Sequence, residues 1–118
     1  MTKANDSILN STKVYCGIVP EYDAFDETIL MLINSALSTL EQLGVDIEED
    51  FVVEDDMTTW DEIDSRRRIL NLIIQYIQIY VRLNFDPPQN SFAGQAAQKQ
   101  LDELVWRIRV QAERYVGS

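Results

Sequence analysis

The stretch between residues 69 and 85 constrains the fold of this chain more than any other part of its sequence. Twelve of its seventeen residues are apolar. The polar residues Asn71, Gln75, Gln78 and Arg82 recur at spacings of four, three and four, so they form one narrow stripe along a helix. A helix that is apolar around the rest of its circumference has to be covered on most sides. The pattern therefore predicts the central helix of an all-α bundle, too short and too polar along its stripe to span a membrane.

Two signals bound this central helix. Thr59 and Glu62 have the spacing of a capping box, in which a Thr hydroxyl and a Glu carboxylate bind each other's backbone amides at a helix start. At the other end, Asp86-Pro87-Pro88 removes backbone donors and forces extended geometry. The sequence therefore predicts a long helix that starts at Thr59 and runs to about Phe85.

A second long helix is predicted directly after this turn. Asn90 or Ser91 can cap it, and apolar residues recur at spacings of three and four as far as Val116. Residues 87–89 leave room only for a tight turn, so we expect the two long helices to form an antiparallel hairpin on which the small bundle is built. The predicted buried stripe of the last helix consists of Ala97, Leu101, Leu104, Ile108, Ala112 and Tyr115.

Two shorter helices are predicted before the hairpin. Asp6 or Ser7 can cap the first of them, which ends before Gly17. Asp23 can cap the second, whose apolar residues recur at spacings of three and four until Gly44 ends the helix. Both are expected to pack against the hairpin.

The segment from residue 45 to 57 breaks the helical pattern. Seven of its thirteen residues are acidic, and most of the others are β-branched or aromatic. No helical period fits, so we expect an extended acidic loop between the second and third helices, with its carboxylates directed outward. The Asp-x-Asp-x-Asp-Gly spacing and the closing Glu of a calcium-binding loop are absent, which argues against a calcium site.

Charge is divided unevenly along the chain. Residues 1–64 carry 16 acidic and 2 basic side chains, whereas residues 65–118 carry 4 acidic and 8 basic ones. One interpretation is that the two halves fold against each other and neutralise internally. The other is that copies of the chain pack head to tail, acidic half against basic half, a geometry that closes into a ring or continues into a filament.

Composition argues against several classes of function. The chain has no His and one Cys, Cys16, so a structural zinc site, a His-based catalytic triad and a disulfide are not expected. A formal net charge of -10 argues against direct binding to nucleic acid or to anionic membranes. The N-terminus has no apolar stretch of signal-peptide length, and a lone cysteine fits a reducing compartment, so assembly in the cytosol is expected.

At 118 residues and 46% apolar content, residues 1–118 are predicted to form one domain.

Candidate interface residues come from the charged segments and from one aromatic. Arg66 and Arg68 can pair with acidic residues four positions earlier in one helix, or, with Arg67, reach the acidic loop of another subunit. Trp106 lies off the buried stripe of the last helix and is a further candidate. The carboxylates expected to receive the arginines are Glu48, Glu49, Asp50, Glu54, Asp55 and Asp56.

No pattern in the sequence indicates catalysis or a cofactor. The nucleophile elbow and the glycine-rich phosphate loop are both absent. Glu54, Asp55 and Asp56 are the densest acids that an enzyme could use, but they fall in a loop that is expected to be solvated. No catalytic, cofactor-binding or metal-ligating residue is therefore predicted.

Three segments together resemble one protein family. They are residues 33–44, residues 76–88, and the run Glu103-Leu104-Val105-Trp106-Arg107. The most specific part is the tract that ends in the turn Phe85-Asp86-Pro87-Pro88. In the same order, over roughly residues 6 to 110, the chain resembles the head–tail connector, or head-completion, proteins of tailed bacteriophages with long non-contractile tails.

This resemblance implies a small all-helical adaptor of the phage neck. It implies a homo-oligomeric ring, a dodecamer, that binds the portal protein once the genome is packaged and offers a surface to a stopper or tail-completion protein. It also implies a place in the virion, assembly in the host cytoplasm, and no catalytic residues. DNA would pass through the lumen without specific binding, because an acidic lumen repels phosphate. Pro87 and Pro88 have a simpler role as well, which is to stiffen the turn.

One alternative comes from another functional class. An acidic helical protein can imitate the charge of DNA and block a nucleic-acid enzyme. Such a mimic would act as a monomer or dimer, with carboxylates spread like phosphates over a broad face. Here the acids gather in residues 46–64 instead.

Overall fold

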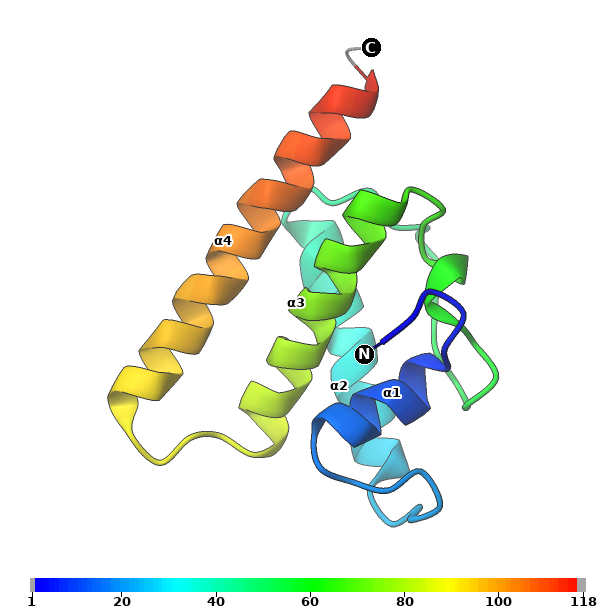
Figure 1. Cartoon of the computed structure of the whole chain (residues 1–118), viewed down its shortest axis with the longest axis vertical. Helices are drawn as coiled ribbons and strands as arrows, with labels where there is room; N and C mark the ends of the chain where they lie inside the picture. Colours follow the sequence, from blue (N-terminus) through cyan, green and yellow to red (C-terminus); the bar gives the residue numbers. More distant parts are fainter. Residues whose placement is uncertain (1, 117–118) are drawn as a thin grey trace.

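The computed structural model describes residues 2–116, and their side chains as far as Tyr115. It contains α1 (Ile8–Tyr15), α2 (Asp26–Gln42), the short 3-10 helix η1 (Trp60–Glu62), α3 (Arg67–Phe85) and α4 (Ser91–Val116) (Figure 1). The described residues form no strand, and Ser7 and Thr59 make one isolated β-bridge. The predicted all-α fold is therefore confirmed.

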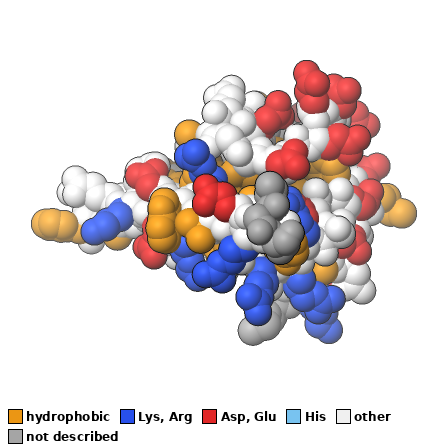
Figure 2. Space-filling view, turned by 90° about the horizontal axis from the view of Figure 1, so that it is seen from above, with side chains coloured by type: hydrophobic (Ala, Val, Ile, Leu, Met, Phe, Trp, Pro, Cys, Tyr) orange, Lys and Arg blue, Asp and Glu red, His pale blue; other side chains and the backbone are white. Residues whose placement is uncertain are grey.

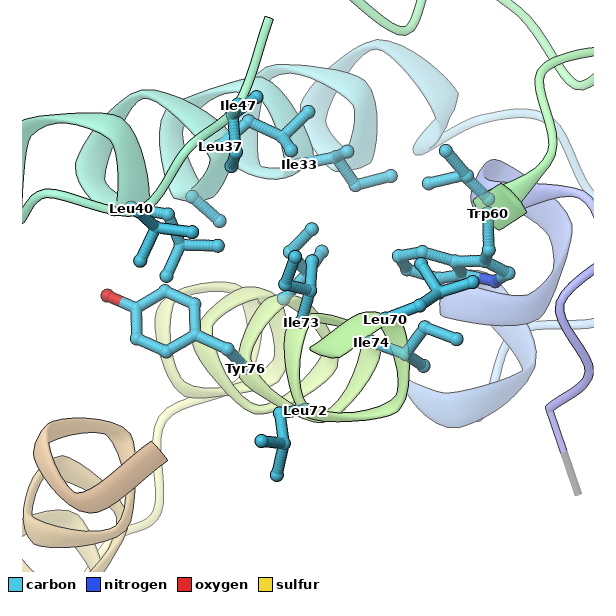
Figure 3. Packing of buried hydrophobic residues seen from close by; sticks show 14 of the residues in the cluster. Ile33, Leu37, Leu40, Ile47, Trp60, Leu70, Leu72, Ile73, Ile74 and Tyr76 are labelled. Atoms are coloured by element: carbon cyan, nitrogen blue, oxygen red, sulfur yellow. The ribbon is translucent and has the colours of Figure 1, made fainter. Parts of the chain in front are cut away.

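Helix α3 is the centre of the molecule, as its apolar circumference requires. It contacts α1, α2, α4 and η1, and it contributes nine buried residues from Ile69 to Val81. Ile33, Leu37 and Leu40 of α2 face Leu70 and Ile73 of α3, with Trp60 at one end of the same layer (Figure 3). Burial of these apolar side chains stabilises the fold by about 25 cal/mol per Å² of apolar surface removed from water.

The start of α3 differs from the prediction. The capping box of Thr59 and Glu62 forms, but it opens only the one-turn η1, and α3 begins at Arg67. Trp60 is fully buried, and its Nε1 donates a hydrogen bond of 2.7 Å to Ser11 Oγ in α1. Arg66 then takes an extended backbone conformation, with φ -78° and ψ 103°. The helix is interrupted at this point because η1 is held against α1, whereas α3 runs through the centre of the bundle.

The start of α2 also differs from the prediction. Asp23 was expected to cap this helix, but the cap residue is Phe25, which makes no side-chain cap hydrogen bond. The ring of Phe25 packs edge-on against that of Phe85, with 5.2 Å between centroids. Asp26 follows in the first turn, where a carboxylate is stabilised by the helix dipole. Packing of Phe25, rather than a polar cap, therefore sets this boundary.

An ion pair between a buried lysine and a half-buried aspartate joins α1 to the start of α2. Lys13 is fully buried, and its Nζ lies 2.6 Å from Asp26 Oδ1 and donates to the carbonyl oxygen of Pro20 at 2.9 Å. A buried ammonium group needs such partners, since desolvation is costly otherwise. The pair therefore holds the connection between α1 and α2. Ser7 caps α1, as one of the two predicted residues.

Helix α4 runs opposite in direction to α3 after the turn at residues 86–90 (Figure 1). Asn90 caps it, because the backbone N–H of Ala93 donates to Asn90 Oδ1 at 2.8 Å. Leu101, Leu104 and Ile108 of its predicted stripe are buried, and Val105 joins them. The expectation for Tyr115 was wrong: this residue is exposed.

The polar stripe of α3 is partly covered. Asn71, Gln75 and Arg82 are exposed, but Gln78 is buried. Its Nε2 donates a 3.0 Å hydrogen bond to Thr2 Oγ1. The segment before α1 therefore covers part of this stripe. The periodicity of α3 alone could not indicate this contact.

The two tryptophans provide a matched test of this packing. We expect Trp60→Phe to lower the free energy of unfolding by about 1–3 kcal/mol, because it removes the bond to Ser11 and leaves a void. Trp106→Phe should change stability by less than about 0.5 kcal/mol, because Trp106 is largely exposed. Urea denaturation measures both, and equal losses at the two positions would contradict the assignment of Trp60 to the core.

Candidate assembly surfaces

Apolar side chains and one asparagine anchor the acidic loop. Val45, Ile47 and Val53 are buried. Asn34 of α2 makes two hydrogen bonds to Val53: its Nδ2 donates to the Val53 carbonyl oxygen at 2.9 Å, and its Oδ1 accepts from the Val53 N–H at 2.8 Å. These contacts fix the loop to the outer side of α2 without any strand. The predicted extended loop therefore has a defined backbone position.

The six predicted interface acids lie on the solvent side of this loop. Each is exposed, and they stand in two runs of three residues: Glu48, Glu49, Asp50, Glu54, Asp55 and Asp56. Asp55 Oδ1 also accepts the backbone N–H of Met57 at 2.9 Å. The loop therefore presents a dense carboxylate surface that its anchored backbone holds in place.

Arg66 has a partner within its own chain. Its Nε and Nη2 lie 3.0 and 2.7 Å from the two carboxylate oxygens of Asp64, and its guanidinium lies 5.5 Å from the ring centroid of Tyr115. The hydrogen bond to Asp64 raises the pKa of Arg66 above its ordinary value. The helical pairs expected at a spacing of four do not form, because residues 62–66 precede α3. Because Arg66 already has this partner within its own chain, it is less suited than Arg67 or Arg68 to contact another subunit.

Arg67 and Arg68 are exposed at the first turn of α3. Arg68 lines a shallow depression with Gln111, Arg114 and Tyr115 of α4. Within the described residues, ion pairs join Lys13 to Asp26 and Arg66 to Asp64, and none joins the acidic loop to Arg67 or Arg68. Both side chains are therefore exposed, and their contact with another subunit stays a prediction.

The division of charge along the sequence is also a division in space. Figure 2 shows Asp and Glu side chains gathered mainly at the upper right of the molecule and most Lys and Arg side chains along its lower side, with single side chains of both signs on the rest of this face. Arg68 and Arg114 line one depression together, and the acidic loop supplies a dense set of exposed carboxylates. A subunit with two oppositely charged sides is suited to head-to-tail contact with its own copies.

Exposed aromatics lie on α4. Trp106 is 66% exposed, in agreement with its position off the buried stripe, and Phe92 in the first turn is 82% exposed. Phe92 was not among the predicted interface residues. The signal that could have found it is its spacing from Trp106, fourteen residues or two heptads, which places both on one line of the helix.

The turn motif mainly shapes the end of the molecule. Phe85 packs against Phe25, whereas Asp86, Pro87 and Pro88 are exposed. The last three line an open groove together with Arg82 and Tyr15, and the guanidinium of Arg82 lies 5.8 Å from the ring centroid of Tyr15. This arrangement fits the simpler role of the prolines as a stiff turn.

The described residues offer little to hold a metal ion. They contain no group of three or more His, Cys, Asp or Glu side chains that could hold one. Burial raises the pKa of the Cys16 thiol and that of the Tyr76 hydroxyl. Both shifts favour the neutral form, so neither group is prepared as a nucleophile or base.

None of the described helices has the length and apolar character that crossing a membrane would require.

The fold and its surfaces define a small all-helical protein with a dense set of exposed carboxylates. The family model described as phage connector protein matches residues 8–115, nearly the whole chain. The chain therefore belongs to the phage connector protein family. This is a structural family, and membership gives the chain a structural role at the head–tail junction of a phage virion. Comparison with curated proteins gives no match, and neither does comparison with solved structures.

The anchoring of the acidic loop is testable at Asn34. We expect Asn34→Ala to lower the free energy of unfolding by about 1–3 kcal/mol, because it leaves the N–H and C=O of buried Val53 unpaired. The loop should also become more sensitive to limited proteolysis. Ser38→Ala, at an exposed position of the same helix, is the control and should behave as the wild type. Unchanged cleavage in Asn34→Ala would show that apolar contacts alone hold the loop.

Proposed function

We propose that the chain is an adaptor that forms a ring on the portal protein after DNA packaging and joins the phage head to a stopper or tail-completion protein. The observation that carries this proposal is the separation of charge onto two sides of the subunit (Figure 2). Family membership supplies the head–tail context. The subunit number, a dodecamer, follows the resemblance of the sequence to phage adaptors.

The proposed contact between neighbouring subunits depends on pairs of oppositely charged side chains. Arg67 and Arg68 of one subunit meet the carboxylates at positions 48–56 of the next. Planar guanidinium groups suit two-point contact with carboxylates, and several such pairs in each interface add up around a ring. Because the same two surfaces differ from each other, the contact is heterologous, and heterologous contacts that close produce rings.

The surplus of acids fits passage of DNA. With a net charge of -10 per chain, a ring carries a large negative charge even after its interfaces are paired. A lumen of this sign repels phosphate and gives DNA no surface to bind. Assembly would take place in the host cytoplasm, where the portal becomes accessible once packaging ends.

Charge reversal tests the neighbour contact. Arg67→Glu with Arg68→Glu should prevent ring formation on purified portal, because like charges then face each other across every interface. Glu54→Lys with Asp55→Lys should do the same. The chain that combines all four changes should recover assembly, since each interface is complementary again. Light scattering after size exclusion, with and without portal, measures the outcome.

Arg107→Glu is the control, because Arg107 is exposed on α4 and belongs neither to the arginines of α3 nor to the acidic loop. It should assemble on portal as the wild type does. A wild-type protein that stays monomeric and ignores portal would overturn the adaptor proposal and favour the DNA mimic. Assembly of the wild type without rescue in the fourfold variant would retain the adaptor and reject this particular contact.

A further inference from the structure

An exposed face of α4 has the residue spacing of a coiled-coil seam. Its members recur at intervals of four, three, four, three and four, which places them along one line of the helix as a and d positions. Val110 is half-buried and the other five are exposed. The members, which we call the α4 seam, are Phe92, Ala96, Lys99, Glu103, Trp106 and Val110.

The core of this chain does not use the α4 seam. Leu101, Leu104 and Ile108 bury the opposite side of the helix against the bundle. In Figure 1, α4 forms one edge of the molecule, and no described element lies beyond it. The two largest apolar side chains of the seam, Phe92 and Trp106, nevertheless remain 82% and 66% exposed. Such aromatics on an outer line of a helix are typical anchors of an interface.

We infer that the α4 seam binds the α4 seam of a second copy of this chain, antiparallel, around a two-fold axis near Leu101. In this arrangement Lys99 opposes Glu103 of the other copy. Ala96 opposes Trp106, and Phe92 opposes Val110. Every contact occurs twice, because the three pairs are symmetrical about the same position. The seam is therefore complementary to itself, which is what an isologous contact requires.

Charge decides the direction of pairing. If the two helices were parallel and in register, Lys99 would face Lys99 and Glu103 would face Glu103, which is repulsive. The antiparallel arrangement pairs each lysine with a glutamate and leaves the apolar residues opposite one another. It also places each a position against a d position, as antiparallel coiled coils do. The sequence of the seam fits only one of the two directions.

The size of the contact makes it reversible. Phe and Trp side chains bury about 150–250 Å² each, so four aromatic anchors contribute several hundred Å² to a symmetric pair. This places the contact at the lower end of specific interfaces, below about 1,200 Å² in total. Asp102 lies beside the seam near the axis and would oppose its own copy, which weakens the pair further. The dimer should therefore dissociate on dilution.

This dimer is distinct from the ring proposed above. Its axis is two-fold and its contact isologous, whereas ring neighbours meet through two different surfaces. Its residues lie along the outer line of α4, whereas the ring contact uses Arg67, Arg68 and the acidic loop. The dimer is a state of the free protein, in which two copies cover each other's exposed aromatics.

Sedimentation velocity of the full chain, from low micromolar to near-millimolar concentration, tests the inference. We expect a monomer–dimer equilibrium. Lys99→Glu should raise the dissociation constant by about tenfold or more, because four glutamates then surround the axis. Glu103→Lys should do the same. A mixture of the two variants should form heterodimers with nearly wild-type affinity, since each glutamate again faces a lysine.

Further variants separate this contact from the ring and from unfolding. Asp102→Asn should lower the dissociation constant, because it removes the repulsion at the axis. Trp106→Ala should weaken the dimer, whereas Met31→Ala, which removes a side chain with 64% exposure on α2, should not. Arg68→Glu should leave the dimer intact, and circular dichroism confirms the fold of each variant. A wild-type monomer at all concentrations, or a dimer that Arg68→Glu breaks and Lys99→Glu does not, overturns the inference without affecting the adaptor proposal.

Discussion

Burial of α3 is the constraint on which the rest of the structure depends. Its apolar circumference has to be covered on several sides. In this chain α1, α2 and α4 pack against it and provide that cover. No described element remains to cover the outer side of α4 or the acidic loop. The surfaces available for assembly are therefore those left over once α3 has been enclosed.

The fold class followed from the sequence because one strong periodic segment determined it. The stripe of polar residues within residues 69–85 was enough to place α3 at the centre, and buried Ile73 and Ile77 agree with that position. Glycines at the ends of α1 and α2 were equally informative, since Gly17 and Gly44 have positive φ angles of 83° and 92°. Local chemistry therefore identified the elements, and hydrophobic periodicity identified the core.

The wrong boundary of α3 depended on a contact between distant parts of the chain, and a local bond followed from it. Thr59 and Glu62 do form a capping box, but Trp60 is held by Ser11 of α1, so the helix it opens lasts one turn. Asp64 then binds Arg66, and this local bond replaces the helical pairs that a continuous helix would allow. Asn34 was not singled out, although its place beside the apolar stripe of α2 was a signal of a buried polar contact. No single-helix pattern contains the partner of such a residue.

Symmetry connects the two proposed contacts. Neighbouring subunits of a cyclic ring are not related by a two-fold axis, so an isologous α4 pair cannot form between neighbours of the same ring. Copies that enter a ring as single subunits leave the dimer first, and each carries an unpaired α4 seam into the assembled neck. Because the seam contains two exposed aromatics, each copy that leaves the dimer for the ring brings an apolar surface into the assembled neck. A weak dimer suits this sequence of events, since its dissociation adds little to the free energy that ring contacts must supply.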